Sequence, residues 1–355
     1  MIKNDKRRWY TMNSNPYSLL FGKEPQETIS RAAQKADIIE SFSSEPSTQQ
    51  IYMITGVRGC GKTVFMTEIS KELNASDSWI IVELSSNGDL LTDFAAALAS
   101  ENYLAKLFQQ ASINLSFFGI GLEVKGSVPI TNVQVAITKM LESIKKNGKK
   151  VLICIDEVTN NSSMQAFASA FQIFIRQDLP LYLLMTGLYE NINNLQNEDN
   201  LTFLYRAPKV ELKPLNITTI SNNYKKTFSL DDDSSLDMAK LTKGYSFAFQ
   251  VLGYFTWKFK GNYKEALPDY QQYLEDYVYE KIWSEMSSGD RKLAYGIAKS
   301  DTGKASEIKT ILGIENNEYT PYRDRLVKRG ILDGSEHGHL KFILPLFEKY
   351  VLANY

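Results

Sequence analysis

One octapeptide constrains this 355-residue chain more than any other feature. Gly56-Val-Arg-Gly-Cys-Gly-Lys-Thr63 matches G-x-x-x-x-G-K-[ST], the pattern of a phosphate-binding loop. The stretch 50–55 before it has the apolar pattern of a strand, and the stretch 64–73 after it has the pattern of a helix. The alternative, an ordinary glycine turn before a helix, is the weaker interpretation because the full motif stands in the context it needs.

The glycines of this loop allow successive N–H groups to turn toward one anion, and the N-terminus of the following helix adds partial positive charge. We expect Lys62 to reach the β- and γ-phosphates of a nucleotide, and the Thr63 hydroxyl to ligate Mg²⁺. The predicted nucleotide-binding residues are Gly56, Val57, Arg58, Gly59, Cys60, Gly61, Lys62, Thr63 and Val64.

A second motif ends a buried strand. Residues 151–155 are all apolar, as in a strand buried on both faces of a parallel sheet, and Asp156 and Glu157 follow them. An acid at the tip of such a strand is costly unless it faces a polar site. We expect Asp156 to hold the Mg²⁺ shell through water, and Glu157 to act as the general base for the attacking water. An Asp-Glu pair that merely caps the next helix is the alternative.

A third apolar stretch, 179–185, ends in Thr186 and Gly187. Thr186 is predicted to orient the attacking water or to sense the γ-phosphate. A threonine that simply ends a strand is an interpretation of nearly equal weight, and the sequence leaves both open.

Composition excludes several classes of protein. The chain is 43% hydrophobic and 23% charged with a net charge of −1, so binding of nucleic acid by bulk charge alone is not expected. Two cysteines and two histidines suggest neither a disulfide framework nor a zinc site. No apolar run follows the basic start, and no stretch approaches the ~20 apolar residues of a membrane span. We expect a cytoplasmic protein without a membrane partner.

The order of strands and helices divides the chain into four predicted parts. Residues 1–48 are an arm and one helix, and residues 49–215 alternate strands with helices, with a β-hairpin inserted at about 112–126. Residues 216–286 are helical throughout, and residues 287–355 have the outline of a winged helix. The alternation predicts an α/β fold whose parallel sheet carries helices on both faces.

Two clusters in the helical part favour structural roles. The acidic run 231–233 is better explained as the cap of a helix that begins near Ser234 than as a metal site. A stripe of aromatic residues is expected to be packing core rather than a platform for stacking a nucleobase. Its members are Tyr270, Tyr273, Tyr277 and Trp283.

The C-terminal part reads as helices at about 290–299, 304–312 and 320–329, followed by a hairpin over 331–343. Its third helix carries the basic residues of a recognition helix, which would enter the major groove of double-stranded DNA: Arg323, Arg325, Lys328 and Arg329. Against this, the eleven Lys and Arg from Glu285 onward face ten Asp and Glu. Winged helices also bind proteins, so DNA and a protein partner both stay open.

Together these motifs resemble the archaeal-type P-loop ATPases, relatives of the AAA+ origin-recognition initiators and of the STAND signalling ATPases. The resemblance covers nearly the whole chain, and it rests on the order and spacing of the two motifs with four further segments: 185–187, 206–215, 244–253 and the terminal winged helix. It implies a P-loop αβα core, a helical lid over 216–286 and a winged helix, with ATP or ADP and Mg²⁺ as ligands. The guanine-reading N-K-x-D motif is absent from the sequence.

The resemblance also bears on single positions. Arg206 stands where related AAA+ proteins carry an arginine finger, which would reach the γ-phosphate of a neighbouring subunit in a homo-oligomer; a surface arginine before an edge strand is the equal alternative. The segment around Arg31 resembles the one that lies beside adenine. The lid helix departs from the AAA+ pattern, because 244–250 lacks the second sensor arginine and Lys243 is a weak substitute.

Two functions compete at this stage. The first is an ATPase that converts ATP and water to ADP and phosphate, drives a conformational change and acts on DNA. The second is a slow, nucleotide-gated signalling or defence switch whose winged helix binds a protein. A DNA-binding regulator that uses ATP only structurally is a third, and the presence of Glu157 argues against it.

Overall fold

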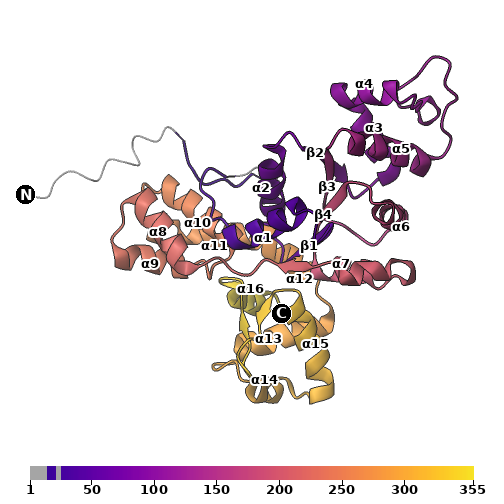
Figure 1. The fold of residues 1–355 in the computed structure, drawn as a ribbon. Coiled ribbons are helices and arrows are strands. Elements are labelled where there is room, and N and C mark those ends of the chain that lie inside the picture. The colour runs from indigo at the N-terminus through magenta and orange to yellow at the C-terminus, as the bar shows by residue number, and fades with distance from the viewer. Residues whose placement is uncertain (1–13, 21–24) are drawn as a thin grey trace, which may run out of the picture. The chain divides into compact units, whose positions relative to one another are not determined.

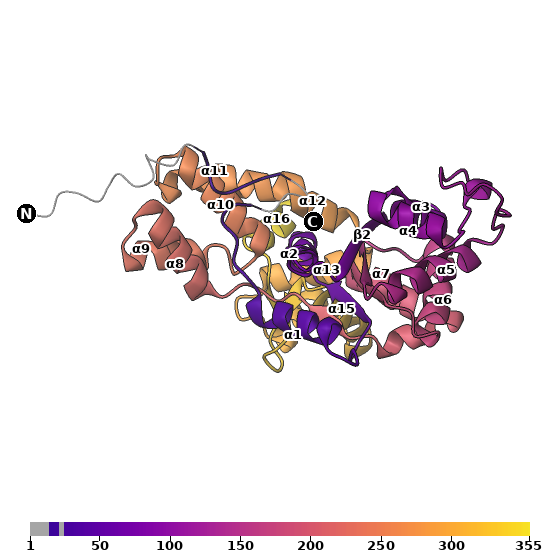
Figure 2. The ribbon, with the colours of Figure 1, turned by 45° about the horizontal axis from the view of Figure 1, so that its top comes forward.

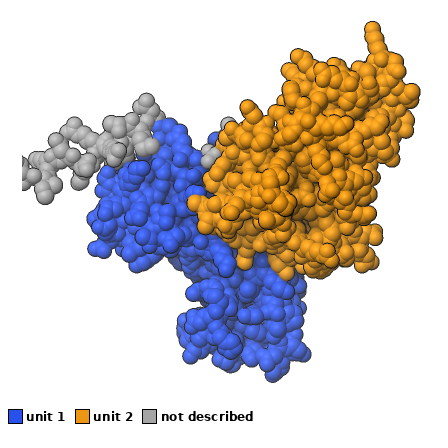
Figure 3. Space-filling view, viewed as in Figure 1, with its two compact units in different colours: residues 1–30, 56–61, 212–355 blue, residues 31–55, 62–211 orange. Residues whose placement is uncertain are grey.

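The structure is a computed structural model that describes residues 14–20 and 25–355. The basic start of the chain and part of the predicted N-terminal arm lie outside the described residues. Contacts divide the chain into two compact units (Figure 3). Unit 2 contains Arg31–Thr55 and Lys62–Glu211, whereas unit 1 contains the residues before Arg31, the loop Gly56–Gly61 and Leu212–Tyr355.

A five-stranded parallel sheet forms the middle of unit 2 (Figure 1). The strand order is β2-β3-β4-β1-β5, and the strands are β1 (Ile51–Thr55), β2 (Trp79–Ser85), β3 (Lys150–Asp156), β4 (Leu181–Gly187) and β5 (Lys209–Glu211). In this register Asp156 pairs with Ser85, and Gly187 pairs with Thr55. The carboxyl ends of the central strands therefore meet at one edge, where Thr186 and the start of the glycine loop also lie.

Side chains that alternate along the strands pack on opposite faces of the sheet. On one face, Phe42 of α1 (Ala32–Ser43) contacts the rings of Tyr52 and Tyr182 at centroid distances of 5.4 and 5.3 Å. Helix α2 (Lys62–Asn74) packs beside α1 and contacts the strands. This face holds an aromatic layer beneath two helices.

The other face carries the main apolar core of unit 2. Met53, Ile153 and Leu183 are fully buried there, in one cluster that includes residues of α7 (Tyr189–Gln196) and of the four helices before it. These four helices are α3 (Leu90–Ser100), α4 (Asn102–Gln110), α5 (Val133–Lys146) and α6 (Ser162–Arg176). The chain then continues through α7 (Tyr189–Gln196) and the 3-10 segment η3 (Asp199–Arg206) to β5. The predicted parallel sheet with helices on both faces is confirmed.

The predicted β-hairpin at about 112–126 is wrong. Between α4 and α5 the structure has no strand, only the 3-10 turn η2 (Ser116–Phe118). The Asn114 side chain donates to the backbone oxygen of Ser127 at 3.0 Å and accepts from the amide of Ser116 at 3.1 Å. The buried Asn114 side chain forms hydrogen bonds with backbone groups of the segment. The segment therefore closes as a loop, and a β-ladder does not form.

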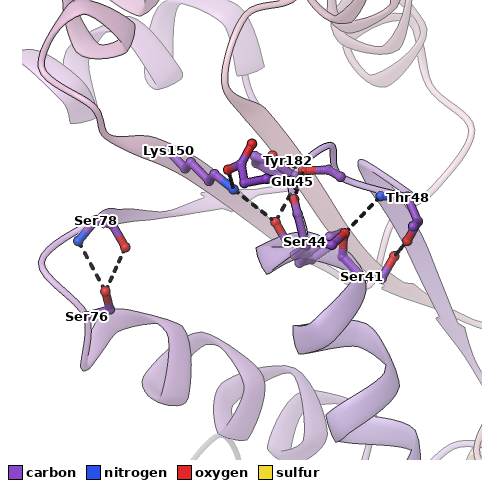
Figure 4. Close-up of polar contacts among 10 residues, drawn as sticks. Ser41, Ser44, Glu45, Thr48, Ser76, Ser78, Lys150 and Tyr182 are labelled. Atoms are coloured by element: carbon purple, nitrogen blue, oxygen red, sulfur yellow. Dashed lines mark hydrogen bonds and ion pairs between the residues drawn. The ribbon is translucent and has the colours of Figure 1, made fainter.

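Polar contacts hold the segment between α1 and β1 against the amino ends of the strands (Figure 4). Lys150 forms a 2.6 Å ion pair with Glu45 and lies over the rings of Trp79 and Tyr182. Ser47 shares a hydrogen bond with the Tyr182 hydroxyl. This end of the sheet is opposite to the edge that carries Asp156. The charged groups of Lys150 and Glu45 therefore stabilise the packing of this segment and are not part of the candidate site.

The middle of unit 1 is helical, as the pattern predicted. Its elements are α8 (Ile217–Phe228), α9 (Asp232–Lys240), α10 (Ser246–Lys258), α11 (Tyr263–Leu274), the π-turn η4 (Glu275–Tyr279) and α12 (Glu280–Ser284). We call α8 to α12 the lid helices; Figure 2 shows them in orange tones. The N-terminal segment packs on them, because Tyr17 is 2% exposed and stacks on Phe228 at 5.7 Å.

The acidic run 231–233 and the aromatic stripe have structural roles, with one exception in the stripe. Asp231 caps α9 by accepting from the amide of Ser234 at 2.7 Å, as predicted. Tyr270 and Trp283 are buried core residues. Tyr277 is 53% exposed and stacks on Tyr273, so the prediction of core is wrong for this residue, which lies within the π-turn η4.

The C-terminal region contains the predicted three helices and hairpin: α13 (Ser288–Lys299), α14 (Ala305–Leu312), α15 (Asn316–Lys328), β6 (Leu332–Asp333) and β7 (Lys341–Phe342). A further helix, α16 (Phe347–Asn354), places Phe347 against Phe342 and Tyr279. Among the described residues, no helix has the length and apolar character needed to cross a membrane.

Candidate nucleotide site

The glycine-rich loop adopts a conformation that only glycine readily permits at three positions. Gly56, Gly59 and Gly61 have φ values of 153°, 77° and 94°. A Cβ atom on Gly59 would lie 2.1 Å from the Tyr245 hydroxyl oxygen, and one on Gly56 would lie 2.5 Å from the sulfur of Cys60. Both the backbone angles and the packing therefore require glycine, and the loop retains the tight turn that an anion-binding backbone needs.

Asp156 is the centre of a polar cluster at the carboxyl edge of the sheet. The Thr63 hydroxyl, in the first turn of α2, donates to Asp156 Oδ2 at 2.7 Å. The fully buried Thr186 hydroxyl, near the end of β4, donates to Asp156 Oδ1. The sequence predicted both threonines as site residues, and the fold brings them to opposite oxygens of one half-buried carboxylate.

Glu157 follows in a left-handed conformation, with φ at 51°. Such a backbone costs a non-glycine residue about 1–3 kcal/mol and persists where surrounding contacts fix it. Here the Glu157 amide donates to Asp156 Oδ1 at 3.0 Å and to the Thr186 hydroxyl at 3.2 Å. The Glu157 side chain is exposed, so solvent water reaches the carboxylate that the sequence predicted to be the base.

The donor set of this cluster fits Mg²⁺. The Thr63 hydroxyl and the Asp156 carboxylate are hard oxygen ligands, and Mg²⁺ typically takes one or two such protein groups together with phosphate oxygens and water. No group of three or more His, Cys, Asp or Glu within residues 14–20 and 25–355 is arranged to hold a metal ion by itself.

The remaining loop residues have varied surroundings. Val57 and Cys60 are buried, and Arg58 forms an ion pair with Glu285 at 3.4 Å. Lys62 and Val64 lie in the first turn of α2 and are half-buried. The other cysteine, Cys154, lies within β3, and burial raises its pKa to about 12, so that it remains a neutral thiol.

Arg206 and the basic helix stand outside this cluster. Arg206 is exposed at the end of η3, just before β5. In α15, Arg325 donates through Nε and Nη2 to Asp290 Oδ1 at 2.9 and 2.7 Å, and Arg329 pairs with Glu285 at 3.9 Å. The other two predicted DNA-contact residues differ: Arg323 pairs with its neighbour Asp324, and Lys328 is exposed.

Sequence reasoning missed three residues that touch the loop. The Tyr245 hydroxyl donates to the carbonyl oxygen of Arg58 at 2.6 Å, and the Ser246 hydroxyl donates to that of Cys60 at 2.9 Å. The amide of Phe247 donates to the carbonyl oxygen of Gly59 at 3.1 Å. They lie in the segment 244–253, which contributes to the resemblance and lacks the sensor arginine, and no local pattern in it predicts these contacts.

Comparison with known proteins identifies the core. Residues 37–179 match a family model described as an ATPase domain predominantly from Archaea. Residues 276–351 match a domain of unknown function, DUF8462. No curated protein matches the chain. The matched segment contains the loop and Asp156.

Solved structures share the fold over nearly the full length. A Walker-type ATPase of Pyrococcus abyssi matches with a TM-score of 0.65 at 15% identity, covering 92% of this chain and 96% of that one. The Aeropyrum pernix ORC2 protein, solved as ADPNP-ADP complexes, matches with a TM-score of 0.61 at 11% identity, covering 98% and 96%. The expected P-loop αβα core with a helical region and a C-terminal hairpin domain is confirmed.

Proposed function

We propose that this protein binds Mg-ATP at the loop 56–63 and hydrolyses it to ADP and phosphate. The observation that carries the proposal is the Asp156 cluster, in which Thr63 and Thr186 hold one carboxylate at the strand ends next to an exposed Glu157. An ordinary glycine turn does not account for two hydroxyls converging on an acid at that edge.

Each side chain has a defined task in this proposal. The loop amides and Lys62 bind the β- and γ-phosphates, while Thr63 and Asp156 would hold Mg²⁺, which would supply positive charge to the phosphate oxygens. The Glu157 carboxylate accepts a proton from the attacking water as its oxygen bonds to the γ-phosphorus and the bond to the β-γ bridging oxygen breaks. Thr186 fixes Asp156 and, through the Glu157 amide, the base.

We propose that the energy of hydrolysis drives a conformational change that acts on DNA. Similarity in fold to an initiator protein and the exposed Lys328 on α15 support this partner. A nucleotide-gated switch that binds a protein is the second candidate, and the ion pairs of Arg325 and Arg329 favour it. Basic side chains already paired with Asp290 and Glu285 are less available to DNA phosphates.

Turnover of ATP by the wild type and by Glu157→Gln, with and without double-stranded DNA, tests the proposal. We expect Glu157→Gln to lower turnover by about 10²–10⁴-fold with ATP affinity unchanged, because the amide cannot accept the proton. Normal turnover in this variant would remove Glu157 as the base. Stimulation of the wild type by DNA, weakening as salt rises, supports the first partner, and slow turnover indifferent to DNA supports the switch.

A further inference from the structure

Three consecutive residues at the start of α10 hold three consecutive carbonyl groups of the glycine loop. Tyr245, Ser246 and Phe247 donate to the carbonyl oxygens of Arg58, Cys60 and Gly59 at 2.6, 2.9 and 3.1 Å. All these residues belong to unit 1. These three contacts are therefore internal to one compact unit, and each of them is made to a carbonyl oxygen of the loop.

Contacts on the carbonyl groups have a consequence for the amides. The N–H and C=O of one peptide point in opposite directions, so a loop whose carbonyl oxygens are fixed on one side turns the attached N–H groups to the other. An anion-binding loop needs its amides to converge on the phosphate. Donors that bind the carbonyl groups orient these peptides without competing for the N–H groups. Within the loop itself, the Cys60 amide donates to the carbonyl oxygen of Val57 at 3.2 Å.

The start of α10 is built to make these contacts. The first amides of a helix have no partner within it, and the Gly59 carbonyl supplies one for Phe247. Tyr245 is the N-cap residue, yet its side chain bonds the loop and leaves the cap without a side-chain bond. Burial raises the pKa of the Tyr245 phenol well above its usual value, so the hydroxyl remains a donor.

The backbone before α10 is also fixed. Gly244 has a φ of 75°, and its carbonyl accepts from the amide of Leu215 at 2.7 Å. A Cβ on Gly244 would lie 2.5 Å from the carbonyl oxygen of Leu215. The chain that enters the lid helices thus holds the turn that presents Tyr245 and Ser246 to the loop.

We propose that Tyr245 and Ser246 are positioning residues that preorganise the phosphate-binding loop before nucleotide arrives. This inference rests on the proposed nucleotide site. Because both residues act on the loop rather than on the γ-phosphate, they strengthen the binding of ATP and ADP by the same factor. They leave the rate of the chemical step at saturating ATP unchanged, which a sensor of the γ-phosphate would not do.

Calorimetric titration of Mg-ATP and Mg-ADP into Tyr245→Phe, Ser246→Ala and the double variant tests this inference. A net hydrogen bond is worth about 0.5–1.5 kcal/mol, so each single variant is expected to raise both Kd values roughly three- to tenfold. Turnover at saturating ATP is expected to stay at the wild-type value. In the nucleotide-free protein, hydrogen exchange of the amides in 58–61 should become faster in Tyr245→Phe.

Tyr224→Phe is the matched control, because it removes an equally buried hydroxyl that donates to a carbonyl of the same helix, Phe249, at 2.8 Å. We expect it to leave both Kd values and the loop exchange unchanged. If Tyr245→Phe lowers stability too far for titration, Ser246→Ala decides the matter, since Ser246 is only half-buried.

Wild-type affinity in Tyr245→Phe and Ser246→Ala would overturn the inference, and so would a loss confined to ATP or a loss matched by Tyr224→Phe. Lys62→Ala separates this failure from failure of the proposed function. If Lys62→Ala abolishes binding while the α10 variants bind normally, the nucleotide site stands and the positioning role falls. If wild type and Lys62→Ala bind equally poorly, the proposed function itself fails, and the inference with it.

Discussion

Asp156 of unit 2 is half-buried and Asp290 of the C-terminal region is buried, and the partners of the two acids differ in kind. Asp156 accepts from the neutral hydroxyls of Thr63 and Thr186 and from the Glu157 amide. Asp290, 1% exposed, accepts from the guanidinium of Arg325 and closes a capping box with Ser287. Neutral donors orient a carboxylate and leave its charge for a cation, whereas a guanidinium neutralises it.

This difference teaches that charge in a motif does not by itself indicate a binding surface. The basic pattern of α15 resembles a recognition helix, yet Arg325 and Arg329 complete ion pairs with acids of preceding segments. The Asp-Glu pair at the end of β3 resembles a simple helix cap. Asp156 nevertheless accepts hydrogen bonds from the hydroxyls of Thr63 in α2 and Thr186 in β4. The hydrogen-bond and ion-pair partners of a charged side chain, rather than its residue type, therefore indicate whether its role is structural or functional.

Among the substitutions that test this comparison of the two acids, Asp156→Asn has the largest expected effect. We expect ATP turnover to fall about a hundredfold, because residues that support a metal shell typically contribute 10- to 100-fold. Unfolding stability should change little, since Asn retains the carbonyl oxygen that accepts from a threonine. Steady-state turnover over a range of Mg²⁺ concentrations, with thermal unfolding of the same sample, measures both. If turnover were undiminished, Asp156 would have a structural role like that of Asp290, and the proposed role in the Mg²⁺ shell would be wrong.

The converse substitution, Asp290→Ala, should lower stability and spare turnover. Removing one member of a buried pair typically costs 3–5 kcal/mol, and we expect about 2 kcal/mol because the Arg325 side chain is 39% exposed. Denaturant unfolding gives the difference. Asp324→Ala, whose pair with Arg323 is partly exposed, is the control and should cost less than about 1 kcal/mol. Equal losses in the two variants would contradict the internal role of Asp290.

The smallest effect concerns Glu307, a half-buried acid whose donors are also neutral. Hydrogen bonds from the Thr302 and Ser300 hydroxyls and the Asp301 amide lower its pKa to about 2. Because the folded pKa lies below the ordinary value of 4.5, its contribution to stability is present above pH 4.5 and is lost as pH falls toward 2. The Tm difference between wild type and Glu307→Gln should therefore shrink over this range.

Glu318→Gln, an exposed substitution in α15, controls for the removal of one negative charge from the same region. Tm measured from pH 7 to pH 2 for the three proteins separates the two cases. A difference for Glu307→Gln that stays constant with pH would show that these hydrogen bonds do not favour the ionised carboxylate.

The parts of the proposed nucleotide site were predictable where they are contiguous in the chain. The loop 56–63 depends on glycines whose backbone freedom is local, and Asp156 and Glu157 follow a strand whose burial shows in five successive apolar residues. Parallel strands place their carboxyl ends at the same edge of a sheet, so the sequence could place Thr186 and Asp156 at one edge, but their contact depends on the pairing of β3 with β4. The hairpin prediction failed because one asparagine, Asn114, competes with strand pairing through side-chain bonds.

By itself, the sequence determined the loop, the acidic pair and the alternation that builds the sheet, because backbone freedom and strand burial are properties of neighbouring residues. Only the tertiary structure decided which basic side chains of α15 form ion pairs and which residues form hydrogen bonds with the glycine loop. Tyr245 meets Arg58 across 187 positions and Arg325 meets Asp290 across 35. Hydrogen bonds and ion pairs act over a few ångströms in space, and the folded chain alone brings such distant residues within that range.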